Sequence, residues 1–301
     1  MKIYPECIPC FLKQVVHIAK IADIPDSLTM EILRESARFI SKDLRVDKSP
    51  GHNATFIHRI FKEKTKLEDP YKLLKDKYNE IALHLEEKIR KEFFEGVDDK
   101  LSLAIRLAAV GNVIDFGVPR DFDLFSEVEA LLDIPFAYFD VDILERFLIQ
   151  GKEVLYIADN AGEIVFDKFL LEELKNRGLK VVLAVRGGPI LNDATVEDAL
   201  KTEAVNYVDE LITTGKDFIG VDFDFVSSEC KDYWNKAYFV ISKGQANFET
   251  LEEVDSKDIF FILKAKCPPV AKHLNCNVND LVFLYNKHLL EMRESEDSQE
   301  G

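Results

Sequence analysis

LYIADNAGEIVFD, residues 155–167, changes character in its middle. An apolar run ends at Asp159 and Asn160, a small residue and a glycine follow, and a helical pattern begins at Glu163. A short apolar run that passes directly into a helical pattern is typical of a strand in a parallel sheet and the helix that covers it. The stretch therefore predicts a buried strand whose end carries a carboxylate beside a carboxamide.

The second half of the chain repeats this pattern. KVVLAVRG (180–187), KAYFVISKG (236–244) and DIFFILKAK (258–266) are short apolar runs that end in polar or glycine residues, and helical segments separate them. VNYVDELITTG (205–215) and LVFLYN (281–286) are further candidate strands. This alternation predicts an α/β fold with a mostly parallel sheet covered on both faces.

The first half shows helical spacing instead. Segments 10–22, 27–44, 71–96 and 98–117 carry apolar residues at intervals of three and four, and the third ends at Gly96. We therefore predict a helical domain over residues 1–150, an α/β domain over 151–290 and a polar tail over 291–301.

Composition excludes several classes of protein. Apolar residues form 47% of the 301 residues, with 22 Phe, which is enough for a sizeable core. The net charge of −16 disfavours nonspecific binding to nucleic acid or to an anionic membrane. No apolar run approaches the ~20 residues that span a bilayer, and the N-terminus lacks the apolar core of a signal peptide. We expect a cytoplasmic protein, with monomer and oligomer both open.

The strand ends are the candidate site, because ligands of open α/β sheets bind at the carboxyl ends of the strands. Asp159, Asn160 and Asp193 offer only oxygen ligands, which suit hard divalent cations. Arg186 and Lys243, at two of these ends, could neutralise phosphate oxygens. The plainer alternative also stands: an Asp or Asn at a strand end is often the cap of the next helix.

Five cysteines is an odd number and a small one for 301 residues, which argues against a secreted disulfide scaffold. Cys7 and Cys10 form a C-x-x-C without a second pair, so a structural zinc is weakly supported. They precede a helix at the N-terminus, outside the strand context of a thioredoxin-like motif. Cys267, at a strand end, is a candidate to face the site, and burial as small apolar residues is the default for all five.

Several blocks resemble the signature of a known family. They are DNAGEIVFD (159–167), GGPILNDAT (187–195), SKGQANFETL (242–251), KAKCPP (264–269) and, upstream, GNVID (111–115). In this order they are similar to the damage-control phosphatases, formerly catalogued as a domain of unknown function, some of whose relatives were once described as acidic-residue methyltransferases. CIPC at residues 7–10 resembles the prokaryotic branch with paired cysteines.

The resemblance implies a helical N-terminal part packed on a Rossmann-like, three-layer α/β/α domain, and a metal-dependent phosphatase of small phosphorylated metabolites. Its metal ligands map onto Asp159, Asn160 and Asp193. Its Lys-Gly block maps onto Lys243, Gly244 and Asn247, and its upstream block onto Asn112 and Asp115. Gln245 departs from relatives that carry Asp there, which leaves the substrate preference open.

The leading hypothesis is therefore a phosphatase that uses Mg²⁺, Mn²⁺, Co²⁺ or Ni²⁺, with sugar phosphates among its candidate substrates. In it, Asp159 or Glu163 assists the attacking water, and Arg186, Lys243 or Lys264 neutralises the phosphoryl group. Asn112 and Asp115 close over the substrate, and Asn247 completes the phosphate-binding set.

Two alternatives stay open at this stage. The first is a carboxyl methyltransferase dependent on S-adenosylmethionine, although ADNAGEIV has a single glycine and no G-x-G-x-x-G. The second is a non-catalytic metabolite-binding protein, which would bind phosphorylated metabolites and release no phosphate.

Overall fold

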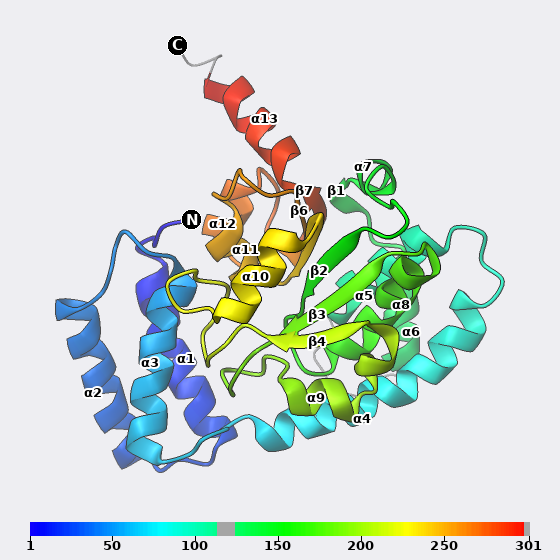
Figure 1. Ribbon diagram of the computed structural model, residues 1–301. Helices are drawn as coiled ribbons and strands as arrows, with labels where there is room; N and C mark the ends of the chain where they lie inside the picture. The colour runs from blue at the N-terminus through cyan, green and yellow to red at the C-terminus, as the bar shows by residue number, and fades with distance from the viewer. Residues whose placement is uncertain (113–123, 298–301) are drawn as a thin grey trace.

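The computed structural model describes residues 1–112 and 124–297 (Figure 1). Within these residues, seven strands form one sheet in the order β1-β7-β6-β5-β2-β3-β4. The strands are β1 (Phe136–Phe139), β2 (Glu153–Ile157), β3 (Lys180–Val185), β4 (Glu210–Thr213), β5 (Phe239–Lys243), β6 (Ile259–Lys264) and β7 (Leu281–Tyr285). Strands β2 to β6 run parallel to one another, whereas β7 pairs antiparallel with β6 and parallel with β1.

Helices cover both faces of the sheet because its strands are apolar on both sides. Val154 and Tyr156 of β2 belong to one core, while Leu155 and Ile157 belong to the other. The first core includes residues of α4 (Lys72–Ile89), its π-helical continuation Arg90–Phe94, α5 (Lys100–Gly111), α6 (Leu124–Leu132), α7 (Val141–Glu145), α8 (Glu163–Asn176), α9 (Val196–Lys201) and the 3₁₀ turn Ala204–Tyr207. The second includes residues of α10 (Ser228–Lys236), α11 (Gln245–Leu251), α12 (Pro268–His273) and α13 (Asn286–Asp297).

Helices α1 (Cys7–Ile21), α2 (Asp26–Lys42) and α3 (Pro50–Thr65) form a separate bundle beside the sheet, drawn in blue in Figure 1. Ser49 begins α3 by accepting a hydrogen bond from the backbone N–H of His52. Ile190 and Ile219, from loops on the sheet side, complete the bundle's own core. The hydroxyl of Thr55 on α3 accepts a hydrogen bond from the Ile219 N–H at 3.0 Å, so the bundle is tied to those loops.

The α/β class and the helical N-terminal region are confirmed, and all six predicted strands are present. Three details differ from the sequence-based expectations. The boundary near Gly151 does not separate helices from the sheet, because β1 lies before it and pairs with β7. Helix α3 was not predicted, and the expected polar tail begins as a continuation of α13 to Asp297. No helix in the described part of the chain is long and apolar enough to cross a membrane.

Candidate active site

The loops that follow β2 and β3 are joined by backbone hydrogen bonds at the carboxyl edge of the sheet. The Ala194 N–H donates to the Asp159 carbonyl at 2.8 Å, and the Ala161 N–H donates to the Asn192 carbonyl at 2.9 Å. Asn160 and Asp193 pair across this junction as an isolated antiparallel bridge. The structure therefore brings Asp159, Asn160 and Asp193 together from two separate strand ends.

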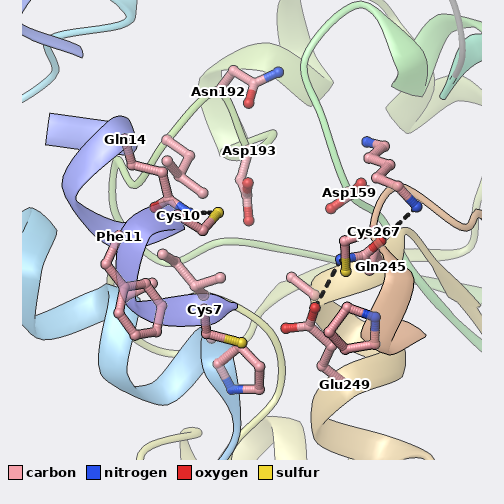
Figure 2. Close-up of a pocket in the computed structure, with 18 of the residues that line it drawn as sticks. Cys7, Cys10, Phe11, Gln14, Asp159, Asn192, Asp193, Gln245, Glu249 and Cys267 are labelled. Atoms are coloured by element: carbon pink, nitrogen blue, oxygen red, sulfur yellow. Dashed lines mark hydrogen bonds between the residues drawn. The ribbon is translucent and has the colours of Figure 1, made fainter. Parts of the chain in front are cut away.

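These three residues lie at one end of a pocket of about 350 Å³ between the helical bundle and the sheet edge (Figure 2). Lys266 is the one basic side chain among the described residues that line it. The walls also include acidic, amide, thiol and apolar side chains: Glu6, Cys7, Cys10, Phe11, Gln14, Pro50, Ala54, Leu191, Asn192, Ile219, Gln245, Glu249, Cys267 and Pro269. The pocket thus has an oxygen-rich end and a wall of sulfur and apolar groups.

Asp159 is held by two carboxamides. Its Oδ2 accepts from Asn112 Nδ2 at 3.0 Å and from Asn160 Nδ2 at 2.8 Å, and no hydrogen bond among the described residues engages Oδ1. Burial, and then the neighbouring charges of Glu163 and Asp193, raise the pKa of Asp159 to about 8, although Lys266 partly offsets them. The oxygen-rich end therefore has more negative charge than the protein itself neutralises.

Asp193 is fixed by Arg186. The Nε of Arg186 donates to Asp193 Oδ2 at 2.6 Å, and its two other nitrogens donate to the Gly220 carbonyl and to Asn247 Oδ1. Burial nevertheless raises the pKa of Asp193. Arg186 and Asn247 are themselves buried and do not line the pocket, so the structure does not support their predicted contact with phosphate. They position Asp193 instead.

Lys243 also differs from its predicted role. Its Nζ is fully buried and donates to the Ala108 carbonyl at 2.9 Å, to Glu163 Oε1 at 2.6 Å and to Asp167 Oδ1 at 2.5 Å. Burial alone would lower the pKa of Lys243, but the two carboxylates raise it, so the ammonium stays charged. All three ammonium protons have acceptors inside the protein, which leaves none for a substrate.

Glu163 lies behind Asp159 and does not line the pocket. Its Oε2 accepts from Asn112 at 2.7 Å and from Asn160 at 3.1 Å, so it orients both amides. Burial alone would raise the pKa of Glu163, but the charge and hydrogen bond of Lys243, together with the Asn112 hydrogen bond, lower it. Glu163 is therefore a positioning residue in this structure, rather than the predicted proton-transfer group.

The remaining predicted residues have different outcomes. Asn112 bridges Asp159 and Glu163 at the base of the site, and Asp115 lies outside the described residues. Lys264 ends β6 and does not line the pocket, whereas Lys266, two residues later, does. The backbone N–H of Lys266 is fixed by Gln245 Oε1 at 2.9 Å. Cys267 lines the pocket, as the sequence suggested it could.

The backbone N–H of Gly162, at the start of α8, is also engaged. It donates to Asn79 Oδ1 at 2.7 Å, so it is not available to an anion. This contact fixes the start of α8 against α4.

The oxygen-rich end fits a hard divalent cation. Two carboxylates with raised pKa values and the Asn160 carboxamide meet there, which is the donor set that Mg²⁺ and Mn²⁺ prefer. Over residues 1–112 and 124–297, no group of three or more His, Cys, Asp or Glu side chains is arranged to hold a metal. A cation there would therefore need donors besides these side chains, and the Asn160 carboxamide is one at hand.

The backbone at Gly244 makes room for Asp159. Gly244 has a φ of 80°, and a Cβ added there would lie 2.0 Å from Asp159 Oδ2. The carboxylate consequently lies directly on the main chain that follows β5, and only glycine allows this approach.

Comparisons with known proteins define the class. Residues 3–282 match the damage-control phosphatase ARMT1-like domain. The chain is 38% identical to a damage-control phosphatase of Archaeoglobus fulgidus, over 94% of this chain and 98% of that protein. It is 34% identical to the damage-control phosphatase PH1575 of Pyrococcus horikoshii, over 96% of this chain and 100% of that protein.

A solved structure agrees with these relatives. The crystal structure of a DUF89 family protein from Pyrococcus horikoshii has a TM-score of 0.89 and 33% identity, and it covers 95% of this chain and 99% of that one. Together the comparisons indicate the phosphatase class and do not favour the methyltransferase alternative. The chain belongs to the damage-control phosphatase ARMT1-like family.

Proposed function

We propose that this protein is a divalent-metal-dependent phosphatase that hydrolyses small phosphorylated metabolites. One observation carries the proposal: Asp159 and Asp193, from different strand ends, converge on a pocket where their charge is incompletely neutralised and where Lys266 faces them. The relatives named as damage-control phosphatases support the reaction class.

The residues fall into two groups, one that would bind the cation and one that would bind the substrate. Asp159, Asn160 and Asp193 would hold the cation, which when bound would polarise the phosphoryl group and offset its charge. Arg186 restrains one Asp193 oxygen and Asn112 restrains one Asp159 oxygen, so both carboxylates are oriented before any ligand arrives. Lys266, which lines the same pocket and whose charge acts on Asp159, would neutralise a phosphoryl oxygen.

The pocket also limits the size of the substrate. A volume of about 350 Å³ accommodates a small metabolite but no macromolecule, and Phe11, Ala54 and Ile219 make part of the wall apolar. The acidic surface implied by the net charge of −16 would repel polyanions such as nucleic acid. Sugar phosphates and related phosphoesters are the substrates to test first.

The test is phosphate release from a panel of phosphorylated metabolites with Mg²⁺, Mn²⁺, Co²⁺ or Ni²⁺, and with a chelator. We expect release that requires an added cation and that Asp193→Ala abolishes. Asp232→Ala removes an exposed carboxylate on α10 and serves as the matched control, with wild-type activity expected. Full activity in Asp193→Ala would refute the proposed site. Metabolite binding without release under any condition would favour the non-catalytic alternative.

A further inference from the structure

Three thiols line the proposed phosphatase pocket and have no part in the function proposed above. Cys7 and Cys10 come from the first turn of α1, and Cys267 precedes α12 on the opposite wall (Figure 2). All three are free cysteines. The described residues contain no three-ligand metal cluster that would account for them.

Cys7 and Cys10 are placed to react with each other. They lie three residues apart in α1, so their Cβ atoms are neighbours on one face of the helix, about 5–6 Å apart. A disulfide needs Cβ atoms about 3.5–4.5 Å apart. Cys7 is the first residue of the helix, where its N–H bonds to the Tyr4 carbonyl instead of to a preceding helical turn. A small adjustment of this first turn would therefore close the gap.

Cys10 is the more accessible of the two thiols. It is exposed, and Gln14 Nε2 donates a hydrogen bond to its Sγ at 3.6 Å, shown as a dashed line in Figure 2. The orientation of Gln14 is fixed at its other end, where Oε1 lies 2.9 Å from His58 Nε2. Burial lowers the pKa of His58 to about 4, so the ring is neutral at pH 7 and can donate from Nε2. The amide N–H is thereby directed at the sulfur, which fixes the exposed Cys10 side chain at the mouth of the pocket.

Cys7 suits the second step. It is half-buried, and burial raises the pKa of its thiol, so it is a poor first nucleophile. Once Cys10 carries a mixed disulfide, however, the Cys7 sulfur is the neighbour on the same helix face.

We propose that Cys7 and Cys10 form a redox-active dithiol that exchanges with low-molecular-weight disulfides entering the pocket. The Cys10 thiolate attacks one sulfur of a disulfide RSSR, forms Cys10–S–S–R and releases RS⁻. Cys7 then loses its proton and attacks the Cys10 sulfur, which forms the Cys7–Cys10 disulfide and releases a second RS⁻. Both leaving thiolates take up protons, so RSSR is reduced to two RSH while the dithiol is oxidised.

The test uses the full chain, reduced and then exposed to glutathione disulfide, with acid quenching, alkylation and mass spectrometry. Cleavage after Lys2 and Lys13 leaves Cys7 and Cys10 on one peptide. In wild-type protein we expect this peptide to lose two hydrogens and to carry no glutathione. Cys7→Ser should stop at a glutathione adduct on Cys10, and Cys10→Ser should react at least about tenfold more slowly. This readout needs no phosphatase activity, so it stands apart from the test of the proposed function.

Two further variants make the result specific. Cys276→Ser removes a thiol that does not line the pocket, and Cys267→Ser removes the thiol of the opposite wall. Both should still form the Cys7–Cys10 disulfide at the wild-type rate. The proposal is overturned if wild-type protein keeps a stable glutathione adduct on Cys10, if Cys267 becomes the partner, or if neither thiol reacts. It is also overturned if Cys10 and Cys267 form a disulfide with each other in Cys7→Ser.

Discussion

Two clusters of carboxylates lie on opposite sides of Glu163, and they differ in how their charge is balanced. In the first cluster, on the buried side, Glu163 and Asp167 share the ammonium of Lys243, and Tyr156 donates a further hydrogen bond to Asp167. In the second, on the pocket side, Asp159 faces a pocket in which Lys266 is exposed to solvent. The first cluster holds its own cation within the fold, although the buried Asp167 Oδ2 has no hydrogen-bond partner among the described residues, whereas the second keeps negative charge for a ligand. Both clusters contain charged residues, and they differ in whether a cation of the protein balances the carboxylates. This balance distinguishes a structural cluster from a candidate site.

The largest expected effect tests the cluster around Lys243. Lys243→Met would leave Glu163 and Asp167 buried without their cation, which should lower the free energy of unfolding by about 3–5 kcal/mol. Urea denaturation measures the change. Lys231→Met, at an exposed position of α10, is the control and should shift stability by less than about 0.5 kcal/mol. If Lys243→Met keeps wild-type stability but loses activity, Lys243 binds phosphate, as the sequence predicted, and its structural role is contradicted.

Asp159→Asn tests the cluster that faces the pocket. The change replaces an acid whose ionised form is disfavoured by burial and by Glu163 and Asp193, so the metal-free protein should keep or gain stability. Phosphate release should nevertheless fall by about 100-fold or more, because the cation loses a charged ligand. Thermal unfolding with and without Mn²⁺ completes the measurement: the cation should raise Tm more in wild-type protein than in the variant. An equal rise in both would contradict the assigned ligand.

Glu249, elsewhere in the same pocket, tests whether a buried carboxylate lowers the stability of the fold in a way that depends on pH. Burial raises its pKa from 4.5 to about 7, although the Gln245 amide partly offsets burial. The folded state thus holds the proton more tightly than the unfolded chain, so this contribution to stability is complete below pH 4.5 and is lost as pH rises through 7. Glu249→Gln should gain roughly 2–3 kcal/mol relative to wild type between pH 4 and pH 8. Urea denaturation across this range checks it, and a pH-independent difference would contradict it.

The smallest expected effect separates two lysines. Lys266→Gln should raise KM for a phosphorylated substrate by about tenfold and leave kcat and stability nearly unchanged, because an exposed side chain contributes mainly to binding. Lys264→Gln is the matched control, since Lys264 ends β6 outside the pocket, and its kinetics should equal those of wild type. The opposite outcome would restore Lys264 as the phosphate-binding residue.

Much of the fold and part of the site could be predicted because they follow from short-range pattern. Apolar runs marked the strands, and the carboxyl ends of parallel strands must meet at one edge, which brings Asp159 near Asp193. The pairing of Lys243 could not be predicted in this way. It depends on Ala108 from α5 and on Asp167 one turn into α8, and both are distant in sequence.

Other features depended on where the chain turns. Lys264 and Lys266 are two residues apart, and only the end of β6 decides which of them reaches the pocket. Strand β1 was missed because four residues after Pro135 give little periodic signal, and their partner β7 lies far along the chain. Cys7 and Cys10 gave a clear motif, but their approach to Cys267 requires the bundle to pack against the sheet edge.

The close approach between Gly244 and Asp159 makes a single backbone position informative about distant relatives. A relative with alanine at the equivalent of Gly244 cannot keep the equivalent aspartate in this place, since the added methyl carbon would overlap the carboxylate. Such a protein must have moved its acidic group. Inspection of this one residue would therefore show, before any homologue is purified, whether it can keep the carboxylate that the proposed metal site requires.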